Sequence, residues 1–209
     1  MQLNRVEVAH GAAFPVIRPI QAADGSGLQQ FIRGLSLASR YSRFMMALRE
    51  LPDDMLGRFV HPQPGREAAL VASSPSAGIV GLAQYVADET GDGCEVAIVV
   101  DDAWHRQGLG TDLLTALMLV ARGNGIGQLH ADVFADNHAM RALAHKLGCE
   151  VRTNAQTPYL AHISRTLESP YTAWEEHLVH RAAARTSAYV REMREGLGDN
   201  KVSIVFDAI

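Results

Sequence analysis

Apolar residues along the chain fall into short runs separated by turn-forming residues, which is the pattern of β-strands. The runs Ala68–Ser73 and Ile79–Ala87 are joined by Ser-Ser-Pro-Ser-Ala-Gly, a connection typical of a hairpin. Further runs predict strands at residues 14–20, 94–100, 128–134, 149–153 and 159–166. Pro15 and Pro19 restrict the first of these strands to a sheet edge or to a short length.

Other segments carry their apolar residues at helical spacing. Asp24 is the predicted N-cap of a first helix, and Asp136 or Asn137 is the predicted N-cap of a late one that stops at Gly148. The remaining predicted helices cover residues 36–48, Pro52 to Val60, and Leu109 to Gly123-Asn124-Gly125. Together with the strands, they predict an α/β fold: a mixed, largely antiparallel central sheet flanked by helices, with one parallel crossover.

The pattern divides the chain into three parts. We expect an N-terminal segment at 1–14, the α/β domain at 15–168 and a C-terminal extension at 169–209. In the extension, an apolar stripe from Trp174 to Met193 predicts a helix, and Val202–Phe206 predicts a last strand. The stripe can pack on the sheet or on a second subunit, so a homodimer is one expected arrangement.

Composition excludes several classes of protein. The formal net charge of −4 over 209 residues argues against nucleic acid as the partner, because such proteins usually carry a basic face. Cys94 and Cys149 have neither disulfide-framework nor zinc spacing, and the nine histidines show no metal-ligand spacing. No signal peptide or membrane span is evident, so we expect a cytoplasmic protein with no metal and no membrane partner.

The segment from Trp104 to Thr111, Trp-His-Arg-Gln-Gly-Leu-Gly-Thr, carries the clearest chemistry. A strand that turns through glycines into a helix leaves backbone N–H groups unpaired at the positive end of the helix dipole, where phosphate binds. Leu113 stands where a Rossmann fingerprint needs its third glycine, and no Gly-Lys-Ser/Thr of a P-loop follows. A tight turn with no ligand is the alternative.

The order of elements and this loop resemble the GNAT N-acetyltransferase superfamily. Its signature Gln/Arg-x-x-Gly-x-Gly/Ala corresponds to residues 105–110, with His105 at the first position. The segment 137–148, Asn-His-Ala-Met-Arg-Ala-Leu-Ala-His-Lys-Leu-Gly, resembles the family's second cofactor segment. The stretches 17–20, 39–44 and 94–100 further resemble the acetyltransferase domain of bacterial protein-lysine acetyltransferases.

The resemblance implies acetyl-CoA as co-substrate and assigns residues to it. It implies that the glycine loop binds the pyrophosphate and that the backbone of the strand at 94–100 binds the pantetheine amides. It also implies that Asn137 lies near the pantetheine arm. The predicted cofactor-binding residues are Ile98, Val99, Val100, His105, Arg106, Gln107, Gly108, Leu109, Gly110, Thr111 and Asn137. Glu95 matches the family's catalytic glutamate and is the candidate general base, the alternative being an ordinary carboxylate that faces solvent.

Ala144 stands where many family members place a tyrosine that protonates the leaving thiolate. His138, His145 and Tyr159 are the remaining candidates for that acid, although surface or packing roles suit them better. Cys94 and Cys149 raise the alternative of an acyl-enzyme, but a small buried residue is the better interpretation of each.

The cluster at residues 40–44, Arg-Tyr-Ser-Arg-Phe, has two interpretations. It lines an acceptor cleft, or Tyr41 and Phe44 lie in the core with the arginines in water. The predicted function is an N-acetyltransferase acting on a primary amine, either a protein lysine or a small molecule, by direct attack in a ternary complex. The alternatives are a non-catalytic acyl-CoA-binding module and, more remotely, a nucleotide-binding domain.

Overall fold

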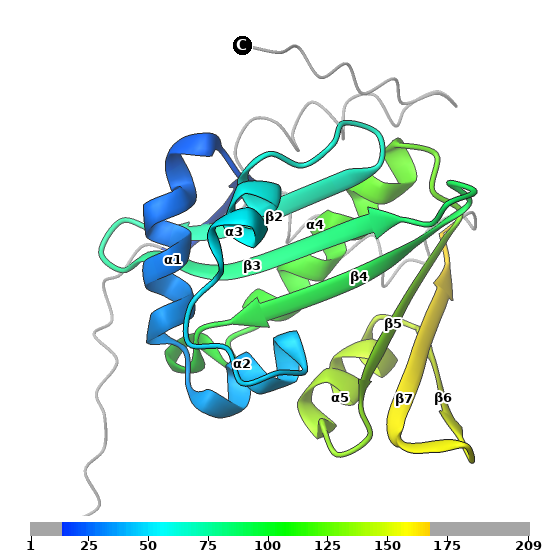
Figure 1. The fold of residues 1–209 in the computed structure, drawn as a ribbon. Coiled ribbons are helices and arrows are strands. Elements are labelled where there is room, and N and C mark those ends of the chain that lie inside the picture. Colours follow the sequence, from blue (N-terminus) through cyan, green and yellow to red (C-terminus); the bar gives the residue numbers. More distant parts are fainter. Residues whose placement is uncertain (1–13, 168–209) are drawn as a thin grey trace, which may run out of the picture.

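The computed structural model describes residues 14–167, so the predicted C-terminal extension at 169–209 and nearly all of the N-terminal segment lie outside the described residues. A seven-stranded sheet in the order β1-β2-β3-β4-β5-β7-β6 forms the centre of the described part (Figure 1). Its strands are β1 (Val16–Pro19), β2 (Glu67–Ser74), β3 (Gly78–Ala87), β4 (Gly93–Val100), β5 (Gln128–Phe134), β6 (Glu150–Asn154) and β7 (Thr157–Thr166). The helices are α1 (Gly25–Gly34), α2 (Leu37–Phe44), α3 (Asp53–Val60), α4 (Leu109–Gly123) and α5 (His138–Lys146).

All neighbouring strands are antiparallel except β4 and β5, which are parallel and are connected through α4. Their pairing is short: Gly93, Cys94 and Glu95 lie opposite Gln128, Leu129 and His130. Beyond that point the two strands separate, as Figure 1 shows, and the sheet opens into a V. The predicted mixed sheet with one parallel crossover is therefore confirmed.

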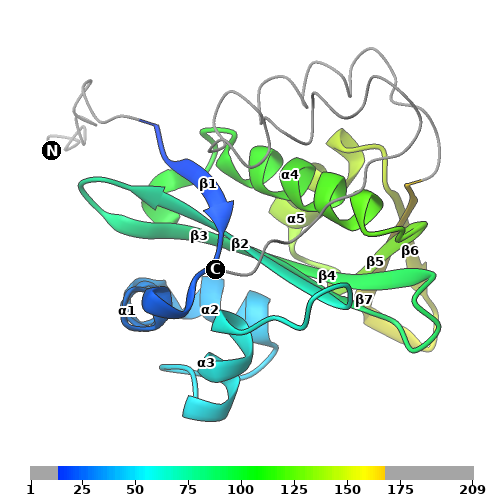
Figure 2. The same cartoon turned by 90° about the horizontal axis from the view of Figure 1, so that it is seen from above.

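The helices form two layers, with α4 and α5 on one face of the sheet and α1, α2 and α3 on the other (Figure 2). Successive side chains of each strand point to opposite faces of the sheet, so apolar residues form a core under each helix layer. On the α4 side Cys94 and Val96 pack with Leu113 and Leu117, and every residue from Thr111 to Ala121 is buried. On the opposite side a second core forms, whose members include Leu28, Ile32, Val71, Leu82 and Val99.

Most of the predicted helix ends are confirmed, because their capping residues act as expected. Asn137 Oδ1 accepts a hydrogen bond from the Met140 N–H at 3.0 Å and so caps α5. Gly125 (φ 82°) and Gly148 (φ 70°) adopt the left-handed conformation just after α4 and α5, which glycine adopts without strain. The predicted helix 36–48 ends earlier, at Phe44, because Met45 takes a left-handed conformation (φ 54°).

Asp24 occupies the N-cap position of α1, as predicted, but its side chain does not cap the helix. Its carboxylate makes no capping bond to that helix; it accepts from the Gln21 N–H upstream and pairs with both terminal nitrogens of Arg18, at 2.6 and 2.7 Å. Asp24 therefore fastens the turn that follows β1 instead of the helix that follows the turn.

Candidate active site

A cleft of about 1360 Å³ opens where β4 and β5 separate. It is lined by β4, by α2 and α3 on one side of the sheet, and by the start of α4 and by α5 on the other. The predicted site residues that line it are Glu95, Ile98, Val99, Val100, His105, Arg106, Gly108, Gly110, Thr111 and Asn137. Residues from three separate segments of the chain, namely β4, the loop that leads into α4, and the start of α5, thus come together in one cavity.

Two predicted residues do not line this cleft. Leu109 is 1% exposed and anchors the first turn of α4 in the core. The side chain of Gln107 folds back, and its Nε2 donates to the Ala103 carbonyl at 2.8 Å. Both side chains stabilise the loop, so only the backbone groups of these two residues are available to contact a ligand.

The phase of the β3–β4 ladder determines which β4 backbone groups face the cleft. Asp88 N–H donates to the Gly93 carbonyl, and Asp101 N–H donates to the Val80 carbonyl, both at 2.9 Å. In an antiparallel ladder such bonded pairs recur at every second residue. Odd-numbered residues of β4 therefore turn their N–H and C=O toward β3, and even-numbered residues turn theirs toward β5.

Ile98 and Val100 are even-numbered and lie past the last β4–β5 pair, so their backbone groups point into the gap between the strands. His105 Nε2 donates to the Val100 carbonyl at 2.9 Å, which leaves the Val100 N–H and both polar groups of Ile98 directed at the cleft. Val99 is odd-numbered and directs its N–H and C=O at β3, while its side chain packs in the core. The expected backbone contact to a ligand is therefore restricted to Ile98 and Val100.

The loop before α4 presents the start of that helix to the cleft. Gly108 (φ 87°) occupies the N-cap position and no side chain caps the helix, whose first backbone bond runs from Asp112 N–H to the Gly108 carbonyl at 3.1 Å. The N–H groups of Leu109, Gly110 and Thr111 precede that bond and have no intrahelical partner. Arg106 also has a positive φ of 58°, an uncommon conformation for a residue with a side chain.

Gly110 has space beside it that points into the cleft. A Cβ at this position would lie 3.6 Å from Leu143, 3.8 Å from Val100 and 4.0 Å from Ile98, and all three residues line the cavity. The side chain of Lys146, from the end of α5, reaches the same place and approaches Thr111 Oγ1 at 3.4 Å. The sequence did not single out Lys146, because only the packing of α5 beside α4 brings its ammonium group to the loop.

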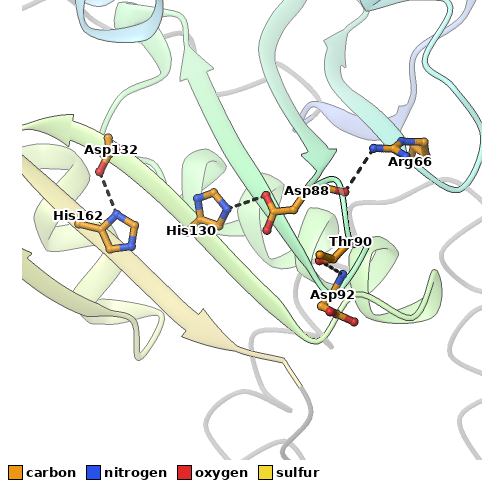
Figure 3. A network of polar contacts seen from close by, with 7 residues as sticks. All are labelled: Arg66, Asp88, Thr90, Asp92, His130, Asp132 and His162. Atoms are coloured by element: carbon orange, nitrogen blue, oxygen red, sulfur yellow. Dashed lines mark hydrogen bonds and ion pairs between the residues drawn. The ribbon is translucent and has the colours of Figure 1, made fainter.

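Glu95 lies at the last pair of β4 with β5, on the sheet face that carries α2 and α3, and its side chain is exposed. Its neighbour across the strands is His130, which therefore lies on the same face. Figure 3 shows two hydrogen bonds on this face. One joins His130 Nε2 to Asp88 Oδ1 at 3.0 Å, and the other joins His162 Nδ1 to Asp132 Oδ1 at 2.9 Å. Beside Glu95 this face thus carries further carboxylates and histidine rings.

Arg43 of α2 lines the same cleft as Glu95, on the face of the sheet that carries α2 and α3. Its guanidinium carbon is 4.8 Å from the ring centroid of Phe44 and 5.7 Å from that of Phe59. Burial lowers the pKa of Arg43 to about 10, against the opposing attraction of Glu95, so the group stays charged at neutral pH. Of the two interpretations of residues 40–44, the one that places the arginines in water is wrong for Arg43, since its Nε and Nη2 are buried.

Two further contacts hold α2 beside β5 and beside the segment after β4. Tyr41 is 47% exposed and stacks on Phe134 of β5, with ring centroids 5.2 Å apart and planes 2° apart. The Asp102 carboxylate accepts hydrogen bonds from the Ser36 backbone and from the Ser36 and Ser39 hydroxyls, and it thereby fixes the start of α2 to the segment after β4. Burial raises the pKa of Asp102, but these bonds outweigh it and the net pKa is lowered.

The structure offers no acid at the position where the family has its tyrosine. Ala144 is fully buried, and its carbonyl accepts from the Cys149 N–H. His138, His145 and Tyr159 are exposed and do not line the described cleft. Nothing in the cleft therefore replaces the missing tyrosine at these positions.

Neither cysteine is suited to carry an acyl group. Cys94 and Cys149 are free thiols buried in the core, and neither lines the cleft. Burial raises the pKa of Cys94 to about 12, with a smaller contribution from Asp88, and burial also raises the pKa of Cys149. Thiolate is the nucleophilic form, so these shifts oppose acylation at both sites.

Within residues 14–167 no helix has the length and apolar character to cross a bilayer. The same residues contain no cluster of three or more histidine, cysteine, aspartate or glutamate side chains able to hold a metal ion.

A sequence model described as the acetyltransferase (GNAT) family matches residues 38–149. Acetyltransferase PA5475 of Pseudomonas aeruginosa is 33% identical to this chain over 136 residues, which are 64% of this chain and 73% of that protein. The GNAT domain of S. lividans PAT has a similar structure, with a TM-score of 0.67 at 25% identity over 76% of this chain and 98% of that domain. At 20% identity, yncA of Salmonella typhimurium, solved with acetyl-CoA, shares the fold with a TM-score of 0.61 over 76% of this chain and 96% of its own.

Proposed function

Because the chain belongs to the acetyltransferase (GNAT) family, whose members carry out acetyl-CoA-dependent acetylation, we propose that it transfers the acetyl group to a primary amine by direct attack in a ternary complex. One observation carries this proposal. Glu95 lies where β4 and β5 begin to separate, inside the cleft that also contains the start of α4. One cavity thus contains both Glu95, which can accept a proton, and the N-terminus of α4, which is suited to bind phosphate.

The residues of the cleft fit acetyl-CoA. The free N–H groups at the start of α4 suit the pyrophosphate, and Arg106 and Lys146 add positive charge there. The backbone groups of Ile98 and Val100 suit the pantetheine amides, and Asn137 borders the same arm. The acetyl-CoA held by the similar fold of yncA supports this assignment.

Glu95 removes the proton that prevents the amine from attacking. A lysine-type amine has a pKa near 10.4, so deprotonating it near neutral pH costs roughly 4 kcal/mol. Glu95 accepts this proton directly or through a water as the nitrogen–carbon bond forms and the carbon–sulfur bond breaks. One of the two cleft-facing N–H groups of β4 stabilises the negative charge that develops on the carbonyl oxygen, the other remains for the pantetheine, and CoA departs as the thiolate.

The acceptor is a protein lysine or a small amine, and the carboxylates near Glu95 suit either ammonium group. A non-catalytic acyl-CoA-binding module is the competing function, supported by His105 in the signature and by Ala144 in place of tyrosine. We place the enzyme in the cytoplasm, where free thiols such as Cys94 and Cys149 persist.

The test is calorimetric titration of acetyl-CoA into the protein, combined with CoASH release on a panel of amines and lysine peptides. Enzyme function predicts saturable binding and acceptor-dependent CoASH release, with intersecting initial-velocity lines when both substrates are varied. Binding without release on every acceptor supports the non-catalytic module, and the absence of binding refutes both.

A further inference from the structure

The side chain of His105, in the loop before α4, turns back towards the end of β4. Its Nε2 lies 2.9 Å from the carbonyl oxygen of Val100. Val100 lies past the last β4–β5 pair, so this carbonyl points into the gap between the two strands. The imidazole ring therefore bridges the end of β4 and the loop that leads into α4, and His105 lines the cleft.

This hydrogen bond determines which ring nitrogen carries a proton. A carbonyl oxygen only accepts, so the single N–H of the neutral imidazole must be on Nε2. Nδ1 then carries a lone pair, and it forms no hydrogen bond with any residue in 14–167. Because His105 is exposed and lines the cleft, a ligand in the cleft can reach the ring.

Charged groups of both signs lie on the segments around the ring. Asp101 and Asp102 begin the short turn before His105, whereas Arg106 follows it in the loop and Lys146 of α5 lines the same cleft. Burial raises the pKa of Asp102, but the hydrogen bonds from the start of α2 and the charge of His105 lower it on balance. Asp102 thus attracts the imidazolium, while Arg106 and Lys146 repel it. The negative charges of a bound pyrophosphate offset that repulsion and favour the charged ring.

We propose that His105 binds the pyrophosphate of acetyl-CoA as the imidazolium, so that the protein takes up a proton when the cofactor binds. This inference rests on the proposed function. The neutral ring uses its one N–H on Val100 and can offer phosphate only a lone pair. A proton from solvent added to Nδ1 converts that lone pair into a charged N–H donor for a phosphate oxygen, and the bond to Val100 is kept. Glutamine or arginine at this signature position donates without gaining a proton, so the coupling depends on the histidine.

Calorimetry in buffers of different ionisation enthalpy measures this proton uptake directly. The ligand is acetyl-CoA without its 3′-phosphate, because a phosphate monoester itself titrates at about pH 6. A histidine with ordinary titration behaviour that becomes charged on binding takes up about 0.5–0.8 proton at pH 7. The complex then holds more protons than the free protein, so the affinity must fall as the pH rises. The expected change in Kd between pH 6 and pH 8 is about 5- to 25-fold.

Three variants assign the proton to one residue. His105→Gln keeps a donor for the Val100 carbonyl but does not titrate, so it should bind without proton uptake and with an affinity nearly independent of pH. His105→Lys carries a positive charge throughout this pH range and should also bind without uptake. His145→Gln is the matched control, because His145 is an exposed histidine next to Lys146 that does not line the cleft. Its proton uptake should equal that of the wild type.

Three results overturn the proposal. Wild-type binding without proton uptake would show that the neutral ring is sufficient, and uptake that persists in His105→Gln would assign the proton to another group. An affinity deficit of His105→Gln that is equal at pH 6 and pH 8 would restrict His105 to maintaining the loop structure. Failure of the wild type to bind acetyl-CoA at any pH is different, because it refutes the proposed function itself.

Discussion

Replacing Gly110 with alanine separates cofactor binding from folding. Gly110 belongs to the first turn of α4, and a methyl group there meets only side chains at 3.6 to 4.0 Å, the range of ordinary van der Waals contact. The protein can therefore accommodate the methyl group. A molecule seated on the helix start cannot, because the methyl group occupies the space between α4, α5 and β4.

We expect Gly110→Ala to stabilise the fold and to weaken acetyl-CoA binding. Alanine is favoured over glycine in a helix by up to about 1 kcal/mol, so Gly110→Ala should raise the melting temperature of a domain this size by up to about 4 °C. An inserted methyl group in a filled site typically costs about 1–3 kcal/mol, which weakens acetyl-CoA binding by roughly 5- to 150-fold.

The assay is thermal unfolding and acetyl-CoA calorimetry on the wild type, Gly110→Ala and Gly34→Ala. Gly34 ends α1 on the surface, and a methyl group there meets nothing within 4 Å, so its variant should bind acetyl-CoA like the wild type. An unchanged affinity in Gly110→Ala would refute the placement of the cofactor at the start of α4. A melting temperature lowered by several degrees would refute the steric reasoning instead.

Two further predictions follow from the shifted pKa values. Burial holds the pKa of Cys94 at about 12, so the native protein should resist iodoacetamide at pH 8 and keep full activity, whereas rapid alkylation with loss of activity would contradict the inert thiol. The hydrogen bond from Arg18 lowers the pKa of Asp24 below its usual 3.8, so the stabilisation from this carboxylate is present above that value and is lost as the pH falls through the lowered one. In denaturant titrations Asp24→Asn should therefore be less stable than the wild type by about 1.5–3 kcal/mol at pH 7. That deficit should vanish in strong acid, and a deficit that persists at pH 2 would assign the effect to packing.

Local sequence signals predicted the order of elements well. Alternating apolar runs and the glycines at 125 and 148 each act within a few residues, so they can be read without the tertiary structure. Asp24 takes the predicted N-cap position, but its carboxylate bonds to Arg18, six residues upstream, instead of to the helix. The early end of α2 depends on the left-handed Met45, which no local signal indicates.

The candidate site was predictable only in part. The glycine loop and Glu95 follow from short motifs, but the backbone direction of Val99 depends on the phase of its pairing with β3. The buried guanidinium of Arg43 and the approach of Lys146 to Thr111 depend on how distant elements pack. Such contacts join segments that have no common pattern in the sequence.

The most direct test of Glu95 compares binding with turnover in Glu95→Gln, with Glu89→Gln in the exposed β3–β4 connection as the control. Loss of a general base predicts unchanged acetyl-CoA affinity and a kcat about 100- to 10,000-fold lower near neutral pH. The deficit should shrink at high pH, where the amine loses its proton without help. Equal turnover in Glu95→Gln and the wild type on the same acceptor would contradict the central claim that Glu95 takes the proton from the amine.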